Sequence, residues 1–299
     1  MEEKRNISNS TSFALASKVK DYFLLIKFTL SFFVVFSTVI SYLLAPNVRF
    51  DLLQVLLLFL AGMLVTGSAN AINQALEKQT DSMMKRTAKR PVASGRMSEQ
   101  EAYVFAAISG LAGVAMMWYF FNFQSALLSL FSLFLYGFIY TPLKKVNSIA
   151  VLVGALPGAL PCLIGWVAAT NEFSAGGWIL FTIQFLWQFP HFWAIAWVAH
   201  GDYSKAGFKL LPSDKGPTKF TALQSVMYSV MMIPVGLLPY YFGISGIVSM
   251  WIVLACNITM VMLCIMLYIR MDVKSARKVM FGSYFYLMIV LLSLYADKV

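Results

Sequence analysis

Nine long apolar stretches alternate with short polar segments along this chain of 299 residues. Each stretch holds about 17 to 25 residues, the length that an α-helix needs to cross the hydrocarbon core of a bilayer. No barrel-like alternation of polar and apolar positions is present, and a backbone in lipid must satisfy its own hydrogen bonds, so all nine are predicted to be helices. The predicted spans are residues 22–44, 52–73, 102–121, 124–140, 148–170, 177–200, 220–242, 246–269 and 278–295.

The composition agrees with this pattern and narrows the class of protein. Hydrophobic residues make up 60% of the chain and charged residues only 12%, and the mean hydropathy is +0.73. An average soluble domain is about 25% charged, so a soluble enzyme is excluded. The polar segments are too short to bury a core of their own, which predicts one all-α membrane domain over residues 1–299 with a polar N-terminal tail at 1–21. The three cysteines, Cys162, Cys256 and Cys264, lie inside apolar stretches, so neither disulfides nor a zinc site are expected.

The basic residues lie almost entirely in alternate loops. The N-terminal tail and the even-numbered loops carry Lys4, Arg5, Lys18, Lys20, Lys78, Lys85, Arg86, Lys89, Arg90, Arg96, Lys144, Lys145, Lys205, Lys209, Lys215, Lys219, Arg270, Lys274, Arg277 and Lys278, whereas the opposite side carries Arg49 and Lys298. By the positive-inside rule, the N-terminus and the even-numbered loops are predicted to be cytoplasmic, in a multi-pass protein of the inner (plasma) membrane. Because this arrangement accounts for the net charge of +10, no nucleic-acid partner is expected.

A first cluster of polar residues stands at the cytoplasmic end of the second predicted span. Asn73, Glu77 and Asp81 are spaced four residues apart, so on a helix they fall within an arc of about 80° and share one face. Two carboxylates and an amide oxygen suit Mg²⁺, which is usually completed by substrate phosphates. Lys85, Arg86 and Arg90 follow, where they can meet phosphate oxygens. The alternative is a solvated helix whose basic end contacts anionic lipid.

Further candidates for such a site lie on the same side of the membrane. Asp202 and Lys205 follow the sixth predicted span, and Tyr140 and Lys144 end the fourth. Asp202 can supply another metal ligand and the lysines can hold phosphate, although membrane anchoring by an interfacial Tyr–Lys pair is the simpler reading of Tyr140 and Lys144. Lys27 lies five residues into the first span, from which it can extend its ammonium group toward the cytoplasmic surface.

His191 is an ionisable residue well inside the sixth predicted span. It is nine residues, or about 14 Å of helix, from His200 at the inner end, and ionisable side chains at such depth are functional candidates. If the helix continues to Asp202, both residues lie on nearly the same face about 16 Å apart, which suits a large substrate. The alternative is that His191 satisfies a helix kinked by Pro190.

Together these motifs resemble those of the UbiA superfamily of intramembrane prenyltransferases and, within it, those of the enzymes that farnesylate heme. The matching motifs are Asn73-x3-Glu77-x3-Asp81-x3-Lys85-Arg86-Thr87-x2-Arg90-Pro91, Tyr140-Thr141-x2-Lys144, the segment from Gly154 to Trp166, and Pro190-His191-Phe192-Trp193 followed by Asp202-Tyr203-x2-Ala206-Gly207-x3-Leu211-Pro212. They cover about the second to sixth spans and the sixth loop, whereas the last three spans match only in hydropathy and number.

The resemblance implies a bundle of nine helices around a central cavity, with Mg²⁺ as cofactor. Farnesyl diphosphate and heme B are the implied substrates, a farnesyl group going to the 2-vinyl group of heme to give heme O. In this reading Asn73, Glu77, Asp81 and Asp202 are the catalytic and metal-binding residues. The diphosphate is assigned to Lys27, Lys85, Arg86, Arg90, Tyr140, Lys144 and Lys205, and the heme to His191, Trp187 and Trp193.

Two departures from the wider superfamily are visible. Many members have Asp directly after the first Asn, where this chain has Gln74, and many have a second Asp where this chain has Ala206, a form shared by the heme branch. The number of metal ions therefore stays open.

Two other functions are consistent with the sequence. One is prenylation of an aromatic acid or quinone precursor; the other is a heme or lipid carrier or transporter that uses His191 as a ligand. Transporters often show two similar halves with polar residues near the midplane, whereas here the polar residues gather on one side, which favours diphosphate chemistry. Other membrane proteins of heme synthesis or oxidase assembly are candidate partners.

Overall fold

Long helices dominate the computed structural model, which describes residues 17–213 and 215–299; the first sixteen residues of the predicted tail lie outside this range. The long helices are α2 (Phe28–Leu44), α3 (Leu52–Leu76), α5 (Glu99–Phe120), α6 (Phe123–Phe134), α8 (Ala150–Thr170), α9 (Ala175–Val198), α11 (Lys219–Tyr241), α12 (Ile247–Arg270) and α13 (Val273–Ala296). Shorter pieces are a helix at Ser17–Leu25, α4 (Lys78–Met83), the π-helical segment η1 (Leu135–Tyr140), α7 (Thr141–Leu143) and α10 (His200–Lys205).

The helices confirm the all-α membrane protein that the sequence predicts. In the described part of the chain, eight helices are long and apolar enough to cross a bilayer, and Ser17–Leu25 with α2 forms a ninth span that is bent by 50°. Many large apolar side chains, such as Leu111 and Trp118, are exposed on the outside of the bundle, where lipid would cover them. The chain is therefore a multi-pass membrane protein.

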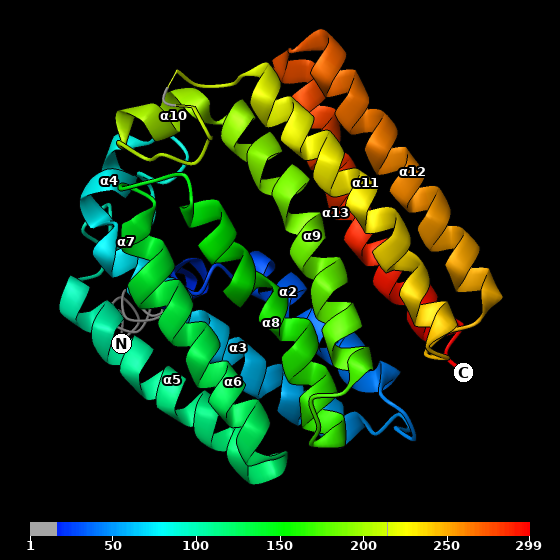
Figure 1. Ribbon diagram of the computed structural model, residues 1–299. Coiled ribbons are helices and arrows are strands. Elements are labelled where there is room, and N and C mark those ends of the chain that lie inside the picture. The colour runs from blue at the N-terminus through cyan, green and yellow to red at the C-terminus, as the bar shows by residue number, and fades with distance from the viewer. Residues whose placement is uncertain (1–16, 214) are drawn as a thin grey trace, which may run out of the picture.

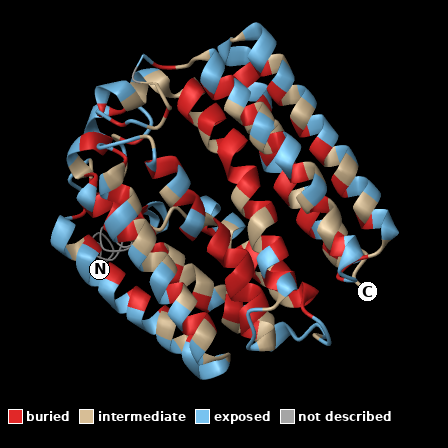
Figure 2. Cartoon of the chain, in the orientation of Figure 1, coloured by how far each residue is buried: buried red, intermediate tan, exposed pale blue. Residues whose placement is uncertain are grey.

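The spans close into a ring. Neighbours in contact around it are α2, α3, α5, α6, α8, α9, α11, α12 and α13, and α13 returns to α2 (Figure 1). The helices α8 and α9 are buried along most of their length, whereas each of the other spans buries less than half of its residues (Figure 2). The short elements α4, α7 and α10 gather at one end of the bundle, on the side that the basic loops predict to be cytoplasmic.

The first span is broken at Lys27, which the sequence does not predict. Lys27 adopts a left-handed conformation with φ of 49°, so the carbonyl groups just before it lose their helical partners. Side-chain amides of α3 replace those partners: Gln74 Nε2 donates to the carbonyl oxygens of Leu24 and Leu25 at 2.9 Å each, and Asn70 Nδ2 donates to that of Ile26 at 3.1 Å. Polar backbone atoms at membrane depth need such partners, so Gln74 stabilises the break.

The short helix before the break is held to the inner surface by polar contacts. Lys18 Nζ and Tyr22 Oη each lie 2.8 Å from a carboxylate oxygen of Glu101 at the start of α5. Arg96 Nε donates to Asp21 Oδ1 at 2.9 Å. The break and these contacts together direct the Lys27 side chain toward α3.

Replacing Gln74 tests this account of the break. Gln74→Ala leaves the carbonyl group of Leu25 without its side-chain donor and takes one of two donors from that of Leu24, and we expect it to lower the free energy of unfolding by about 1–3 kcal/mol. Gln79→Ala, at an exposed position of α4, is the matched control and should change it by less than about 0.5 kcal/mol. The measurement is unfolding of each purified variant in detergent, followed by circular dichroism, and equal midpoints for the two variants would contradict the role of Gln74.

Candidate active site

Asn73, Glu77 and Asp81 lie on one buried face, as their spacing predicts. The helix α3 ends at Leu76, three residues beyond the predicted boundary, and Glu77 separates it from α4. Helical hydrogen bonding nevertheless continues across this junction, since Glu77 N donates to the carbonyl oxygen of Asn73 at 3.0 Å and Asp81 N donates to that of Glu77 at 2.7 Å. All three residues are less than 5% exposed. They form the acceptor row of the site.

Each member of the acceptor row accepts a hydrogen bond from a basic side chain. Lys27 Nζ donates to Asn73 Oδ1 at 2.8 Å, Lys144 Nζ donates to Glu77 Oε1 at 2.9 Å, and Arg90 donates to Asp81 Oδ2 at 2.7 Å. The three basic side chains come from separate parts of the chain, namely the break in the first span, the residue after α7 and the segment after α4. A buried carboxylate is strongly unfavourable without a partner, so the ion pairs to Lys144 and Arg90 stabilise Glu77 and Asp81 in the site.

The end of the fourth span completes this arrangement. A π-helical segment, η1, precedes Thr141, whose Oγ1 accepts from Asn73 Nδ2 at 3.2 Å. The ring of Tyr140 packs against α8 at Gly154, where a Cβ would stand 2.5 Å from Tyr140 Cε2, so only glycine allows this approach. The predicted fourth span, 124–140, thus extends through η1 and α7 to Leu143.

Lys144 lies in a closed, partly aromatic environment. Its Nζ is 4.4 Å from the centre of the Tyr140 ring and 5.9 Å from that of Phe208. Burial lowers the pKa of Lys144, but the negative charge of Glu77 and the hydrogen bond to it outweigh burial and hold the pKa above its usual value. Lys144 is therefore a cation at neutral pH. Lys209 N also donates to the carbonyl oxygen of Lys144 at 2.7 Å, which ties the sixth loop to the site.

The second motif stands beside the acceptor row, but its carboxylate does not join it. Arg86 donates to Tyr203 Oη at 3.0 Å and lies over the Tyr203 ring, so the segment after α4 contacts α10. Asp202 is half-buried, and in the described residues no three His, Cys, Asp or Glu side chains are close enough to share a metal ion. Lys85 and Lys205 are exposed. The four-ligand metal site predicted with Asp202 is thus not assembled here.

The chemistry of Asp81 nevertheless fits a hard cation. Its Oδ1 is fully buried and has no hydrogen-bond partner in the described part of the chain, while Oδ2 is held by Arg90. An unpaired anionic oxygen in a buried site is costly, and an oxygen ligand of this kind is what Mg²⁺ prefers. Asp81 is accordingly the member of the acceptor row best prepared for a metal ion.

His191 is buried between α9 and α13. Its Nδ1 lies 2.8 Å from Ser283 Oγ. Its ring stacks on that of Trp187, with ring centres 4.7 Å apart and an interplanar angle of 19°, and forms a T-shaped pair with Tyr284, with ring centres 5.1 Å apart. Trp187 and His191 are four residues apart and share a face of α9, as the helical period requires. The structure thus brings Trp187, but not Trp193, to the predicted heme-binding histidine.

Trp193 lies on another face of the same helix. Two residues beyond His191 it points about 200° around α9, and it packs against Phe189 and Tyr228 with ring centres 5.5 and 5.4 Å away. We infer that Trp193 belongs to the packing between α9 and α11.

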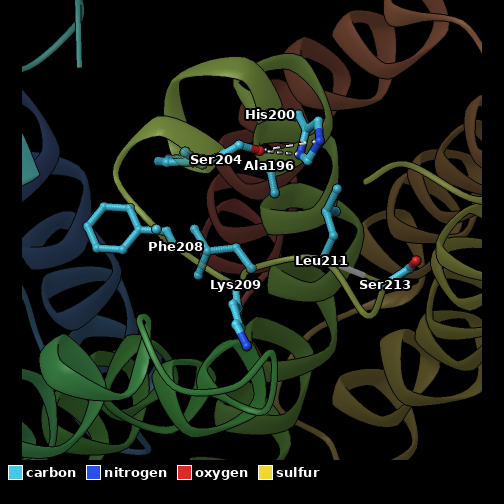
Figure 3. A pocket seen from close by; sticks show the side chains of 10 residues that line it. Ala196, His200, Ser204, Phe208, Lys209, Leu211 and Ser213 are labelled. Carbon is cyan, nitrogen blue, oxygen red and sulfur yellow. Dashed lines mark hydrogen bonds between the residues drawn. The ribbon is translucent and has the colours of Figure 1, made fainter. Parts of the chain in front are cut away.

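Two cavities are present near these residues. The first, of about 100 Å³, lies inside the bundle between α2, α3, α6, η1 and α8 and is lined mainly by apolar side chains. Asn70 and Tyr136 also line it. Asn70 lies about one helical turn before Asn73 of the acceptor row, and Tyr136 lies about one turn before Tyr140. The second, of about 240 Å³, lies beneath the sixth loop, where His200 and Ser204 face each other and the Lys209 amine points away from them (Figure 3). None of the predicted site residues lines the second cavity.

Comparison of the sequence with known proteins shows the family. The model of the UbiA prenyltransferase family matches residues 34–289. The chain belongs to the UbiA prenyltransferase family. Among its relatives in this family, the protoheme IX farnesyltransferase of Cytophaga hutchinsonii is 46% identical over 285 residues, covering 95% of this chain and 100% of that protein. The protoheme IX farnesyltransferase of Flavobacterium johnsoniae is 42% identical over 272 residues, covering 89% of this chain and 90% of that protein.

Solved structures show that the fold is shared as well. A structure from work on digeranylgeranylglyceryl phosphate synthase in membranes superposes with a TM-score of 0.77 at 23% identity, covering 94% of this chain and 98% of that one. A UbiA homolog from Archaeoglobus fulgidus bound to GPP and Mg²⁺ gives a TM-score of 0.69 at 16% identity, covering 92% of this chain and 99% of that one. The UbiA-like helical bundle implied by the motifs is therefore confirmed.

Several residues of this UbiA site were not among the predicted site residues. Thr141 and Tyr203 stand within the quoted motifs, and their proximity to candidate residues is the signal that can identify them. Gln74 is a departure from the superfamily pattern, and the structure shows that it supports the break that places Lys27. Ser283 lies in the ninth predicted span among apolar residues, and nothing in the sequence relates it to His191.

Proposed function

We propose that this UbiA family member is a protoheme IX farnesyltransferase, which transfers a farnesyl group from farnesyl diphosphate to the 2-vinyl group of heme B and releases diphosphate. The observation that carries the proposal is the acceptor row, whose three members each accept a hydrogen bond from a basic side chain, about one helical turn from Asn70 on the wall of an apolar cavity. A carrier has no need of such a row. The relatives named above bear the name of this activity.

The cations of the site are suited to an anionic leaving group. In this proposal Lys27, Arg90 and Lys144 turn from the acceptor row to the phosphate oxygens of the substrate. Mg²⁺ then takes their place beside Glu77 and Asp81. Arg86 beside Tyr203, with Tyr140 and the exposed Lys85 and Lys205, forms the outer part of the diphosphate site. Such donors stabilise negative charge as the carbon–oxygen bond breaks.

The acceptor row is the proposed place of Mg²⁺. Asp81, with its free Oδ1, together with Glu77 and Asn73, would hold the ion, and Asp202 would join them from α10. When bound, Mg²⁺ supplies charge neutralisation to the departing diphosphate. The structural neighbour from Archaeoglobus fulgidus is described with GPP and Mg²⁺, which supports the assignment.

The reaction needs the cavity as well as the charges. Carbon 1 of the farnesyl chain leaves the diphosphate oxygen and bonds to the outer carbon of the vinyl group; the inner vinyl carbon then takes the hydroxyl of a water molecule, whose proton is released. An allylic cation reacts with any water nearby, so the chain must lie where bulk water is excluded. His191 and Trp187 are the proposed heme contacts on the other side of the site.

Asp81 gives the most direct test of the proposed chemistry. With heme B, farnesyl diphosphate and Mg²⁺, we expect the parent protein to form a farnesylated, hydroxylated heme that mass spectrometry detects, and we expect chelation of Mg²⁺ to stop diphosphate release. Asp81→Asn should reduce turnover by roughly 10²–10³-fold, because a charge at the leaving group is lost. Glu172→Gln, at an exposed position far along the chain, is the control and should retain parent turnover.

The outcomes of that assay separate the alternatives. A prenylated aromatic acid or quinone precursor in place of a heme product would move the chain to another branch of the family. Turnover that is equal in Asp81→Asn and the parent, or that continues without Mg²⁺, would remove the metal and diphosphate assignment.

The inner cavity is the proposed site of the farnesyl chain, and its walls must move apart on binding because about 100 Å³ is smaller than a chain of fifteen carbons. It follows α3 from Asn70 to Gly62, about 12 Å of helix, and Ala69 lies on its wall. Ala69→Phe should therefore lower turnover with farnesyl diphosphate roughly 10–100-fold while sparing the shorter geranyl diphosphate more. Leu60→Phe, on the lipid-facing side of α3, is the matched control. An equal loss with both diphosphates, or no loss, would place the chain elsewhere.

The proposed orientation places the acceptor row on the cytoplasmic side of the inner membrane. The argument is the excess of Lys and Arg in the tail and even-numbered loops. In a background without native cysteines, a thiol introduced as Glu172→Cys should react with an impermeant maleimide in intact cells, whereas Ser82→Cys should react only after the cells are opened. Both positions are exposed in the structure. The reverse pattern of labelling would invert the topology.

A further inference from the structure

Ser283 makes two contacts that together determine the state of His191. Its Oγ lies 2.6 Å from the carbonyl oxygen of Met280, one turn earlier in α13, and 2.8 Å from Nδ1 of His191 on α9. Ser283 is fully buried and His191 is 7% exposed. Neither contact is exchanged freely with water.

A hydroxyl group has one proton, and the shorter contact requires it. Two oxygens 2.6 Å apart repel each other unless a hydrogen lies between them, and a carbonyl has none to give, so Ser283 donates to Met280. The hydroxyl oxygen is then an acceptor toward His191, and Nδ1 must carry the ring proton. A neutral imidazole has a single N–H, so its Nε2 keeps a lone pair.

The ring is also held in one orientation. Trp187 stacks on one side of the imidazole, and its Nε1 donates to the carbonyl oxygen of Ser283 at 2.8 Å. Tyr284 packs against the imidazole in a T-shaped arrangement, with an interplanar angle of 73°. In the described residues Nε2 of His191 has no hydrogen-bond partner. By contrast, the buried side-chain N–H groups of Asn70, Gln74 and Trp187 each donate a hydrogen bond to a backbone carbonyl. A histidine that served only to satisfy the kink at Pro190 would bond to a backbone group of α9, whereas the contact of His191 goes to Ser283 on α13.

We propose that Ser283 fixes His191 in the tautomer protonated at Nδ1, so that Nε2 is the axial ligand of the heme iron. This rests on the proposed function, since it assumes that heme is the acceptor. Ser283 is a positioning residue in the manner of the partners that metal-binding histidines commonly have on their second nitrogen. Ligation through Nε2 would place the porphyrin at the depth of His191, about 14 Å of helix from His200.

Spectroscopic titration tests the proposal apart from turnover. Each purified variant is titrated with heme B and, separately, with metal-free protoporphyrin IX. His191→Ala should lose the spectrum of histidine-ligated heme, and added imidazole should restore it. Ser283→Ala should bind heme B roughly 10–100-fold more weakly, with a shifted spectrum, whereas affinity for the metal-free porphyrin should be unchanged.

Three further variants separate positioning from folding. Ser283→Thr keeps the hydroxyl group and should retain the parent spectrum, and Ser283→Cys, a weaker acceptor of similar size, should resemble Ser283→Ala. Ser293→Ala is the matched control, because Ser293 makes the same contact to the carbonyl of Val290, at 2.9 Å, but touches no histidine. It should bind heme as the parent does.

Two results would overturn the proposal. One is a parent-like heme spectrum in Ser283→Ala and Ser283→Cys. The other is an equal loss of heme B and metal-free porphyrin binding in these variants, which would mean that the iron is not the group recognised. If the parent shows histidine-ligated heme but forms no farnesylated product, the proposed function fails while the assignment of His191 and Ser283 stands.

Discussion

Buried carboxylates at the edge of a bilayer are stable only where cations stand within hydrogen-bond distance, and this requirement shapes much of the chain around Asp81 and Glu77. The basic side chains of the site come from segments with irregular backbone. Lys27 lies at a left-handed break, Lys144 follows η1 and the short helix α7, and Arg90 lies beyond the interruption between α3 and α4. Irregular backbone is tolerated at such depth only where protein groups satisfy it, as Gln74 and Asn70 do at Lys27.

Features that depend on local spacing could be predicted from the sequence. Spans are long runs of apolar residues, so their number and approximate limits follow from lipid thickness. Asn73, Glu77 and Asp81 repeat every four residues, and the structure places all three on one buried face because helical hydrogen bonding continues through Glu77. The cost of an ionisable group in lipid was enough to single out His191 and Lys27, and both make specific polar contacts.

Features that depend on which helices meet could not be predicted. The break at Lys27 is stable because α3 presents Gln74 and Asn70 to it, and a single sequence does not show that α2 and α3 are neighbours there. Likewise, α13 contributes Ser283 to His191 across 92 residues of chain. Trp193 is different, because its position two residues from His191 already places it on another face of the helix, and the structure packs it against Phe189 and Tyr228.

The central claim is that the basic side chains of the acceptor row pass to the diphosphate when substrate and Mg²⁺ bind. A structure with a non-reactive analogue of farnesyl diphosphate and Mg²⁺ would test it most directly. The distances to compare are those from Lys144 Nζ to Glu77 Oε1, which is 2.9 Å here, and from Arg90 to Asp81 Oδ2, which is 2.7 Å. The account predicts that Lys27, Lys144 and Arg90 donate to phosphate oxygens and that the freed carboxylates face Mg²⁺. A diphosphate bound elsewhere, with all three cation–acceptor contacts of the row intact, would contradict it.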